Sequence, residues 1–472
     1  MTSFLVAVTV LTLVCGAALA FPAVYRRPAF AVFLLFALFP FGLHKLAGVQ
    51  VVQLAALGVA ATVAFVRLSR GASPLGWTNL LWGPLALAGL AVLGTPGGID
   101  PAFAQKQDAT MILGLLLVCA VVGAVRTMAD VRMILLAFLV AGDIVCLNGV
   151  LGARAVTVKF AGAVVDNRAQ GMFDQPNAFG SFCAAVLCVA LGLLLTRQSR
   201  RVRVFAGISA AIAAIAVALS LSRGAVIGAA LAVIGFAVVL PKIRWRILGS
   251  TAAVVVCLLV AGGSHIGPVQ AQVFGTRLTT LFSGNDNPND KRTAAWAEAF
   301  REIQARPLLG FGPNGFPEAS AGAPGIGAAG TDFPELDRPV GIDHAHNVIL
   351  TVAAELGLVA AFVLVAFSLA LGLKLKKAIR LRPPADAGVV IACAAGLLSF
   401  VGHGIVDYTF ANAMVVMPLY LVTGCAVAAT LIRSPERPRD ADPRRAHAVP
   451  VGVSTRPALG SAVSTRSSLR GS

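Results

Sequence analysis

The stretch NVILTVAAELGLVAAFVLVAFSLALGL, from Asn347 to Leu373, is followed at once by KLKKAIRLR, from Lys374 to Arg382, and this combination decides the fold. A helix that crosses a bilayer needs about 20 mostly apolar residues, and the run exceeds that length. Basic residues collect at the cytoplasmic ends of membrane helices. We therefore expect Asn347–Leu373 to cross a membrane and Lys374–Arg382 to face the cytoplasm.

Similar apolar runs occur along most of the chain. Its 472 residues are 57% hydrophobic and only 12% charged, with a mean hydropathy of +0.84, which is too apolar for a soluble protein of this length. Irregular backbone cannot face lipid, so the runs should be helices. The sequence predicts an all-α, polytopic membrane helix bundle with about 12–13 transmembrane helices. The candidate spans are Ser3–Phe21, Pro28–Leu43, Val49–Val66, Asn79–Leu93, Ala109–Val125, Met133–Leu151, Asn177–Thr196, Val204–Leu221, Ala225–Leu240, Leu248–Gly263, Asn347–Leu373, Ala387–Val406 and Ala413–Ile432.

The formal net charge of +17 could suggest nucleic acid as a partner, but the distribution of the charge indicates topology. Of the 38 Lys and Arg, 26 lie at every second connection between spans or in the tail, whereas residues 264–346 carry nine acids and six Lys or Arg. This is the positive-inside pattern. It predicts an amino terminus and a long loop outside and a carboxyl terminus in the cytoplasm. No nucleic-acid partner is expected, and the basic residues would also attract anionic membrane lipid.

The chain is expected to have four parts. Residues 1–263 would form transmembrane helices 1–10, residues 264–346 a large outer loop with short helices, residues 347–432 helices 11–13, and residues 433–472 a disordered basic tail. In the loop, Trp296, Phe300 and Ile303 recur at helical spacing, which predicts an amphipathic helix along the membrane surface. All eight cysteines lie in apolar spans, so we expect neither a disulfide nor a metal–thiolate site.

Several polar residues lie at membrane depth or at its rim, where charged groups are costly and usually functional. Arg223, in LSLSRGAV, is either an arginine that extends to water from a turn or a fixed cation facing the outer side. Arg168, in NRAQGMFDQPNAFG, taken alone is a solvated loop charge. His403 and Asp407, in GHGIVDYTF, are four residues apart and would share a helix face, with either a structural or a functional role.

A further cluster precedes the eleventh span. Asp343, His344 and His346 come just before the apolar run, and Asn347 can cap the helix that follows. A single histidine at a helix mouth is usually structural. The residues around His346, however, favour a functional role for it.

The stretch AHNVILTVAAELGLVA resembles the signature of the O-antigen ligase and O-antigen or exopolysaccharide polymerase family of integral membrane glycosyltransferases. In that signature a His-Asn pair opens a helix and is followed by Glu and Gly, here His346, Asn347, Glu355 and Gly357. The second Gly of the family falls at Ala360. Further agreement comes from SLSRGA, KRTAAWAEAF, RPLLGFGPNGF, PNAFG and VDYTF, so the resemblance extends over about residues 168–418.

The resemblance implies an enzyme of lipopolysaccharide or exopolysaccharide biosynthesis in the bacterial inner membrane, with its active site facing the periplasm. Its donor would be an oligosaccharide on undecaprenyl diphosphate. Its acceptor would be a lipid-linked repeat for a polymerase or a lipid A core sugar for a ligase. Transfer would be inverting and independent of metal or cofactor, and a chain-length regulator is a possible partner.

This chemistry assigns roles to the residues already singled out. The leaving diphosphate needs cations, and arginine binds phosphate through paired hydrogen bonds, so Arg223 and Arg168 are the candidates. The acceptor hydroxyl must lose a proton, for which His346 is the candidate base, oriented by His344 or Asp343. The supporting residues are His344, Asp343, Asn347, Glu355, Arg292, His403 and Asp407.

A transporter or a flippase of lipid-linked glycans is the alternative interpretation. Such proteins also have many spans and buried polar residues, but they often contain inverted repeats around a site at the membrane midplane. No repeat is evident here, and the polar clusters lie toward the outer rim. Pseudo-symmetry between the two halves of the chain would favour the transporter.

Overall fold

A computed structural model describes residues 21–40, 45–46, 49–152, 157–160, 163–166, 168–264, 287–321, 342–410 and 412–433. The chain divides into a unit Met1–Ile432 and a second unit Arg433–Ser472. Residues 3–20 of the first expected span, and the tail beyond Arg433, lie outside the described residues.

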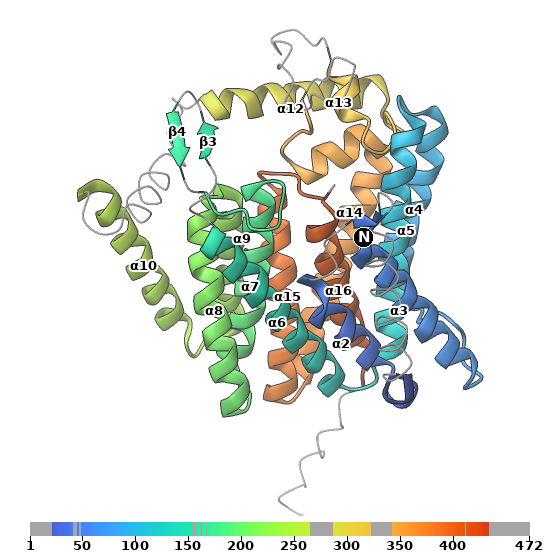
Figure 1. Cartoon of the computed structure of the whole chain (residues 1–472), viewed down its shortest axis with the longest axis vertical. Helices are drawn as coiled ribbons and strands as arrows, with labels where there is room; N and C mark the ends of the chain where they lie inside the picture. The colour runs from blue at the N-terminus through green and yellow to red at the C-terminus, as the bar shows by residue number, and fades with distance from the viewer. Residues whose placement is uncertain are drawn as a thin grey trace, which may run out of the picture. The chain divides into compact units, whose positions relative to one another are not determined.

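The described residues are predominantly helical (Figure 1). The helices are α2 (Ala29–Ala37), α3 (Val51–Leu68), α4 (Trp82–Gly94), α5 (Pro101–Ala124), α6 (Met128–Gly152), α7 (Pro176–Leu194), α8 (Arg200–Ser220), α9 (Arg223–Val239), α10 (Arg244–Ser264), α12 (Asn287–Ala305), α13 (Phe316–Ala319), α14 (Val348–Leu381), α15 (Pro384–Gly404) and α16 (Ala413–Leu431), with short 3₁₀ turns at Asn79–Leu81 and Thr95–Gly97. Two antiparallel hairpins accompany them, β1 (Lys45–Leu46) with β2 (Val49–Gln50) and β3 (Thr157–Phe160) with β4 (Ala163–Asp166).

Nine helices within the described ranges are long and apolar enough to cross a membrane: α3, α4 with its flanking turns, α5, α6, α7, α8, α14, α15 and α16. Helix α9 is apolar but shorter. The prediction of a polytopic membrane helix bundle is thereby confirmed. The boundary between the eighth and ninth expected spans lies at Leu221, which has a left-handed φ of 51°, and at Ser222, whose side chain caps α9 by accepting from Ala225.

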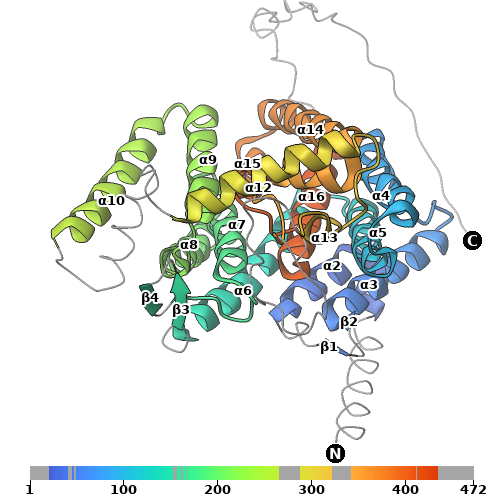
Figure 2. The ribbon, with the colours of Figure 1, turned by 90° about the horizontal axis from the view of Figure 1, so that it is seen from above.

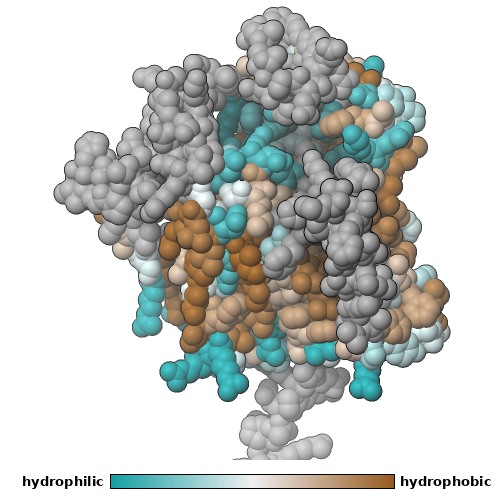
Figure 3. Space-filling view, viewed as in Figure 1, coloured by the Kyte–Doolittle hydropathy of each residue, from teal (hydrophilic) through white to brown (hydrophobic). Residues whose placement is uncertain are grey.

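The bundle has a buried centre and an apolar periphery. Helices α7, α15 and α16 are the most buried spans, whereas α3, α4, α8 and α14 have a third or less of their most apolar stretch buried within the protein. Figure 3 shows apolar side chains across the middle of the face in view, with hydrophilic ones toward its lower end. Exposed apolar side chains on a spanning helix are those that lipid covers, because lipid tails are as apolar as leucine.

Small residues allow α9 and α15 to approach closely. A Cβ added at Gly228 would lie 2.4 Å from the carbonyl oxygen of Ser399, and one at Gly402 would lie 2.8 Å from the Cα of Gly228. Small residues at helix contacts are typical of membrane bundles. This contact brings the first turn of α9, with Arg223, beside the last turn of α15.

Helix α14 is interrupted at Gly357, whose φ of 87° and ψ of 167° are not helical. Only glycine readily adopts such angles. The glycine-rich loop of residues 307–315 lies across the break, where its N–H groups donate to the carbonyls of Ala354 and Glu355 at 3.0 and 2.9 Å and its first carbonyl accepts from Leu358 at 2.8 Å. The loop thus satisfies backbone groups that the break leaves without helical partners.

Helix α12 lies across one end of the bundle, where it contacts α14 (Figure 2). Its inward face carries Ala295, Ala299 and Ile303, while Trp296 and Phe300 are 36% and 56% exposed. The predicted helix is therefore present, but its two aromatic side chains point away from the bundle.

Candidate active site

The segment before α14 has a fixed and unusual backbone. Asn347 caps the helix, since its Oδ1 accepts from the N–H groups of Ile349 and Leu350 at 2.9 and 3.0 Å, while its Nδ2 donates to the carbonyl of Ile405 at 2.9 Å. His346 has a φ of +49°, which is uncommon for a residue other than glycine and is often found at functional sites. The predicted cap is confirmed, and it holds His346 at the mouth of α14.

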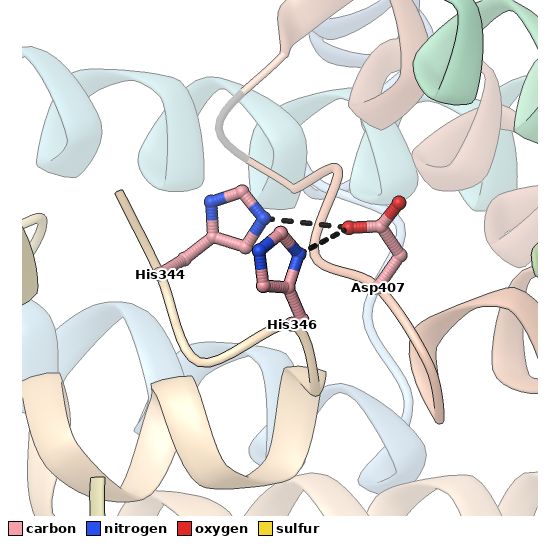
Figure 4. A group of neighbouring side chains, drawn as sticks. All are labelled: His344, His346 and Asp407. Atoms are coloured by element: carbon pink, nitrogen blue, oxygen red, sulfur yellow. Dashed lines mark hydrogen bonds and ion pairs between the residues drawn. The ribbon is translucent and has the colours of Figure 1, made fainter. Parts of the chain in front are cut away.

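Two imidazoles converge on one carboxylate (Figure 4). His346 Nδ1 lies 3.1 Å and His344 Nε2 lies 3.4 Å from Asp407 Oδ1. Asp407 comes from the segment between α15 and α16, and its Oδ1 also accepts from the N–H of Tyr408 at 2.9 Å. An ionised carboxylate only accepts, so each nitrogen that faces it carries a proton. In the neutral form of the His346 ring, the lone pair is then on Nε2.

The carboxylate of Asp407 is 5% exposed, while His344 is 13% and His346 is 30% exposed. Burial alone would raise the pKa of Asp407, but the hydrogen bonds from the two histidines outweigh it and lower the pKa well below its ordinary value. Asp407 is therefore ionised at neutral pH. It can orient the His346 ring and stabilise the positive charge that the ring gains on accepting a proton.

The second oxygen of Asp407 is held by a residue of α7. The amide of Asn177, in the first turn of α7, donates to Asp407 Oδ2 at 2.8 Å. Arg168 donates in turn to Asn177 Oδ1 at 2.9 Å and to the carbonyl of Ser220 at 3.0 Å. Arg168 is 6% exposed, so its guanidinium lies inside the protein, behind the carboxylate. The chain of bonds fixes the direction of Asp407.

Two arginines supply positive charge near the carboxylate. Arg292 extends from α12 and interacts electrostatically with both Asp407 and Arg223, the first residue of α9. Burial lowers the pKa of Arg292, Asp407 opposes this shift, and Arg223 adds to it. Because the two guanidinium groups repel each other, binding of an anion between or beside them is favourable.

Glu355 lies at the break in α14 and is 4% exposed. Its carboxylate accepts hydrogen bonds from the backbone N–H groups of Asn314 and Phe316, so it holds the glycine-rich loop in place. Glu302 of α12, which is 3% exposed, lies near it, and neither carboxyl oxygen of Glu302 has a hydrogen-bond partner among the described residues. Burial, and then the negative charge of Glu355, raise the pKa of Glu302 to about 8.

Two of the residues expected from the sequence make no hydrogen bond to Asp407 among those that the structure describes, although His403 interacts with it electrostatically. Asp343 is exposed. His403 is 1% exposed and packs against Gly224, and within the described residues its ring nitrogens make no hydrogen bond of normal geometry, although the backbone of Asn177 lies close. His403 and Asp407 were expected to share a helix face, but α15 ends at Gly404 and the carboxylate contacts His344 and His346. The two residues remain neighbours, since the N–H of Asp407 donates to the carbonyl of His403 at 3.0 Å.

The structure adds Asn177 and Glu302 to the residues that sequence reasoning found. Asn177 stands in the PNAFG motif, but nothing in that motif indicates which side chain the amide contacts. Glu302 could not be selected from the sequence, because an acid in a polar helix ordinarily lies on the solvated face of that helix.

The fold and this centre define a multi-pass membrane protein with a histidine–carboxylate pair beside two arginines. Residues 208–365 match the family model described as O-Antigen ligase, and this range includes Arg223, Arg292, His344, His346 and Glu355. Over these residues the match supports an O-antigen ligase and polymerase family assignment, and with it glycan transfer of that general type. No curated protein matches the chain.

Proposed function

We propose that the chain transfers a glycan from an undecaprenyl-diphosphate-linked donor to a sugar hydroxyl of an acceptor at the periplasmic face of the bacterial inner membrane. The observation that supports this most directly is the hydrogen bond of 3.1 Å between His346 Nδ1 and Asp407 Oδ1. It leaves Nε2 as the proton acceptor on a ring that is 30% exposed. A positioned imidazole of this kind is a general base near neutral pH.

The reaction is a single displacement. The acceptor oxygen forms a bond to the anomeric carbon while its proton passes to His346 Nε2. The bond between the anomeric carbon and the diphosphate oxygen breaks, and its electron pair stays on the diphosphate. Attack opposite the leaving group inverts the anomeric configuration. Asp407 stabilises the imidazolium that results.

Arg223 and Arg292 are the proposed partners of the leaving diphosphate. They come from different elements, α9 and α12, and interact electrostatically with each other. Negative charge that grows on the diphosphate relieves their mutual repulsion, so the interaction strengthens as the bond breaks. Arg168, whose guanidinium is engaged with Asn177 and Ser220, has the proposed role of positioning Asp407. The positive charges of Arg223 and Arg292 balance the negative charge of the leaving diphosphate, so the proposal requires no metal ion.

The donor class and the membrane orientation are parts of the same proposal. Basic residues at every second connection favour a cytoplasmic carboxyl terminus and a periplasmic active site. The acceptor is a lipid-linked repeat for a polymerase or a lipid A core sugar for a ligase, and a chain-length regulator is a further proposed partner. Deletion of the gene separates the two: single repeats on the carrier indicate a polymerase, and long chains left on the carrier indicate a ligase.

The decisive experiment measures transfer from a purified lipid-linked donor by the protein in liposomes. His346→Gln should lower transfer on the order of 10²-fold or more, the size expected for loss of a general base, while donor binding persists. His344→Ala should have a milder effect, because that ring contacts Asp407 and the His346 ring and would at most position the base. Robust turnover by His346→Gln would refute the base assignment.

A further inference from the structure

The three groups at the proposed active site have the chemistry and the spacing of a metal site. His344, His346 and Asp407 each offer one ligand atom, and these three atoms lie within 4.8 Å of one another. Two imidazoles and one carboxylate are a set that Zn²⁺ and other divalent transition metals bind. None of the three comes from a flexible surface cluster, since the carboxylate is 5% exposed and the rings are 13% and 30% exposed.

The distances are close to those that a bound ion requires. With bonds of about 2.0–2.1 Å and tetrahedral angles, ligand atoms around Zn²⁺ lie roughly 3.3 Å apart. The two nitrogens lie 3.4 and 3.1 Å from Asp407 Oδ1. An ion would take the place of the two protons that now join the rings to the carboxylate.

The carboxylate is also held as a metal ligand needs to be. Asn177 donates to Asp407 Oδ2 and Tyr408 donates its N–H to Oδ1, and such bonds to ligating groups raise metal affinity. The nearby cations Arg292 and Arg223 oppose a divalent ion. The site should therefore bind more weakly than a structural zinc site.

We propose that His344, His346 and Asp407 form a binding site for Zn²⁺ or a similar transition-metal ion, and that this ion inhibits transfer. A metal on His346 Nδ1 uses the lone pair of that nitrogen, so the ring proton moves to Nε2. Nε2 is the atom that accepts the proton of the acceptor hydroxyl. Metal binding and general base catalysis by His346 therefore exclude each other.

The inhibition rests on the proposed function, whereas the metal site does not. The test uses the full chain in detergent, without a histidine tag, and titrates ZnCl₂ by calorimetry and CoCl₂ by visible absorption. We expect one ion per chain. His344→Gln should weaken binding by about tenfold or more, since even bonds behind a ligand change affinity 10–100-fold. His447→Gln, at a histidine near the carboxyl end of the sequence, is the matched control and should bind as the unmodified protein does.

Transfer is then measured against Zn²⁺ concentration. Saturating Zn²⁺ should lower transfer by at least about tenfold, excess EDTA should restore it, and His344→Gln should need a correspondingly higher concentration for half inhibition. Binding that is unchanged in His344→Gln, or no binding at all, would overturn the site. Binding without inhibition, or activation of chelator-treated protein, would overturn the inhibitory role and would count against His346 as the base.

Discussion

Glu302 should make the docking of α12 depend on pH. The carboxyl group is 3% exposed and both of its oxygens lack a hydrogen-bond partner among the described residues. Burial and the negative charge of Glu355 raise its pKa from 4.5 to about 8, with Arg301 opposing. The folded protein therefore keeps this proton over a range of pH in which the unfolded chain has lost it.

The sign of the effect follows from linkage. The stabilisation is fully present below pH 4.5 and is lost as the pH rises to about 8, because the unfolded state releases the proton first. The rise in pKa corresponds to about 5 kcal/mol at most. Some of this will be relieved by local rearrangement of α12, so a change of about 2–5 kcal/mol is expected.

The perturbation is Glu302→Gln, which keeps the shape of the protonated acid but cannot ionise. Thermal denaturation in detergent, followed from pH 5 to pH 9, should show similar midpoints for both proteins at pH 5 and an advantage for Glu302→Gln that grows toward pH 9. Hydrogen exchange of the α12 amides should show the same trend. Glu318→Gln, at a less buried acid of α13, is the control. Parallel pH profiles for the unmodified protein and Glu302→Gln would refute the reasoning.

Three further predictions concern backbone, network and topology. Gly357→Ala should lower the free energy of unfolding by about 3 kcal/mol or more in thermal denaturation, because φ is +87° and a Cβ would lie 2.0 Å from a loop carbonyl oxygen. Gly372→Ala, the control, has open space around it and should be neutral or stabilising. Asn177→Leu should lower kcat for transfer by about 10- to 100-fold, since a hydrogen bond to a charged group is worth about 1.5–3 kcal/mol; unchanged kcat would exclude a positioning role. Cysteine at Gln304 should react with an impermeant maleimide in spheroplasts and cysteine at Lys377 should not, and the reverse labelling would contradict the proposed orientation.

Much of the fold follows from local sequence. Each long apolar run had only one way to satisfy its backbone in lipid, so helix type and approximate span positions were predictable. The cap at Asn347 was predictable as well, because capping depends on residues two and three positions away. The break in α14 was not, since Gly357 stands inside a continuous apolar run. Its angles depend on a loop from residues 307–315 that packs against it.

The candidate site, too, was only partly predictable from the sequence. His346 was found because its neighbours along the chain carry the pattern, whereas its partner Asp407 is 61 residues away and was first assigned to His403. Arg168 was predicted to bind the leaving diphosphate because that group needs cations. Its hydrogen bonds to Asn177 and Ser220 join different parts of the chain, and sequence alone does not contain that pairing.

The break in α14 indicates where this helix meets the membrane boundary. The apolar part after the break, from Leu358 to Leu373, extends about 24 Å at 1.5 Å per residue, which is less than a hydrocarbon core of about 30 Å. About four residues of the preceding part, Val348–Leu356, are therefore needed to complete the crossing, and the first turn of α14 can remain at the polar boundary. For the proposed reaction, this places His346, which precedes that turn, at the height where the diphosphate of the carrier meets water.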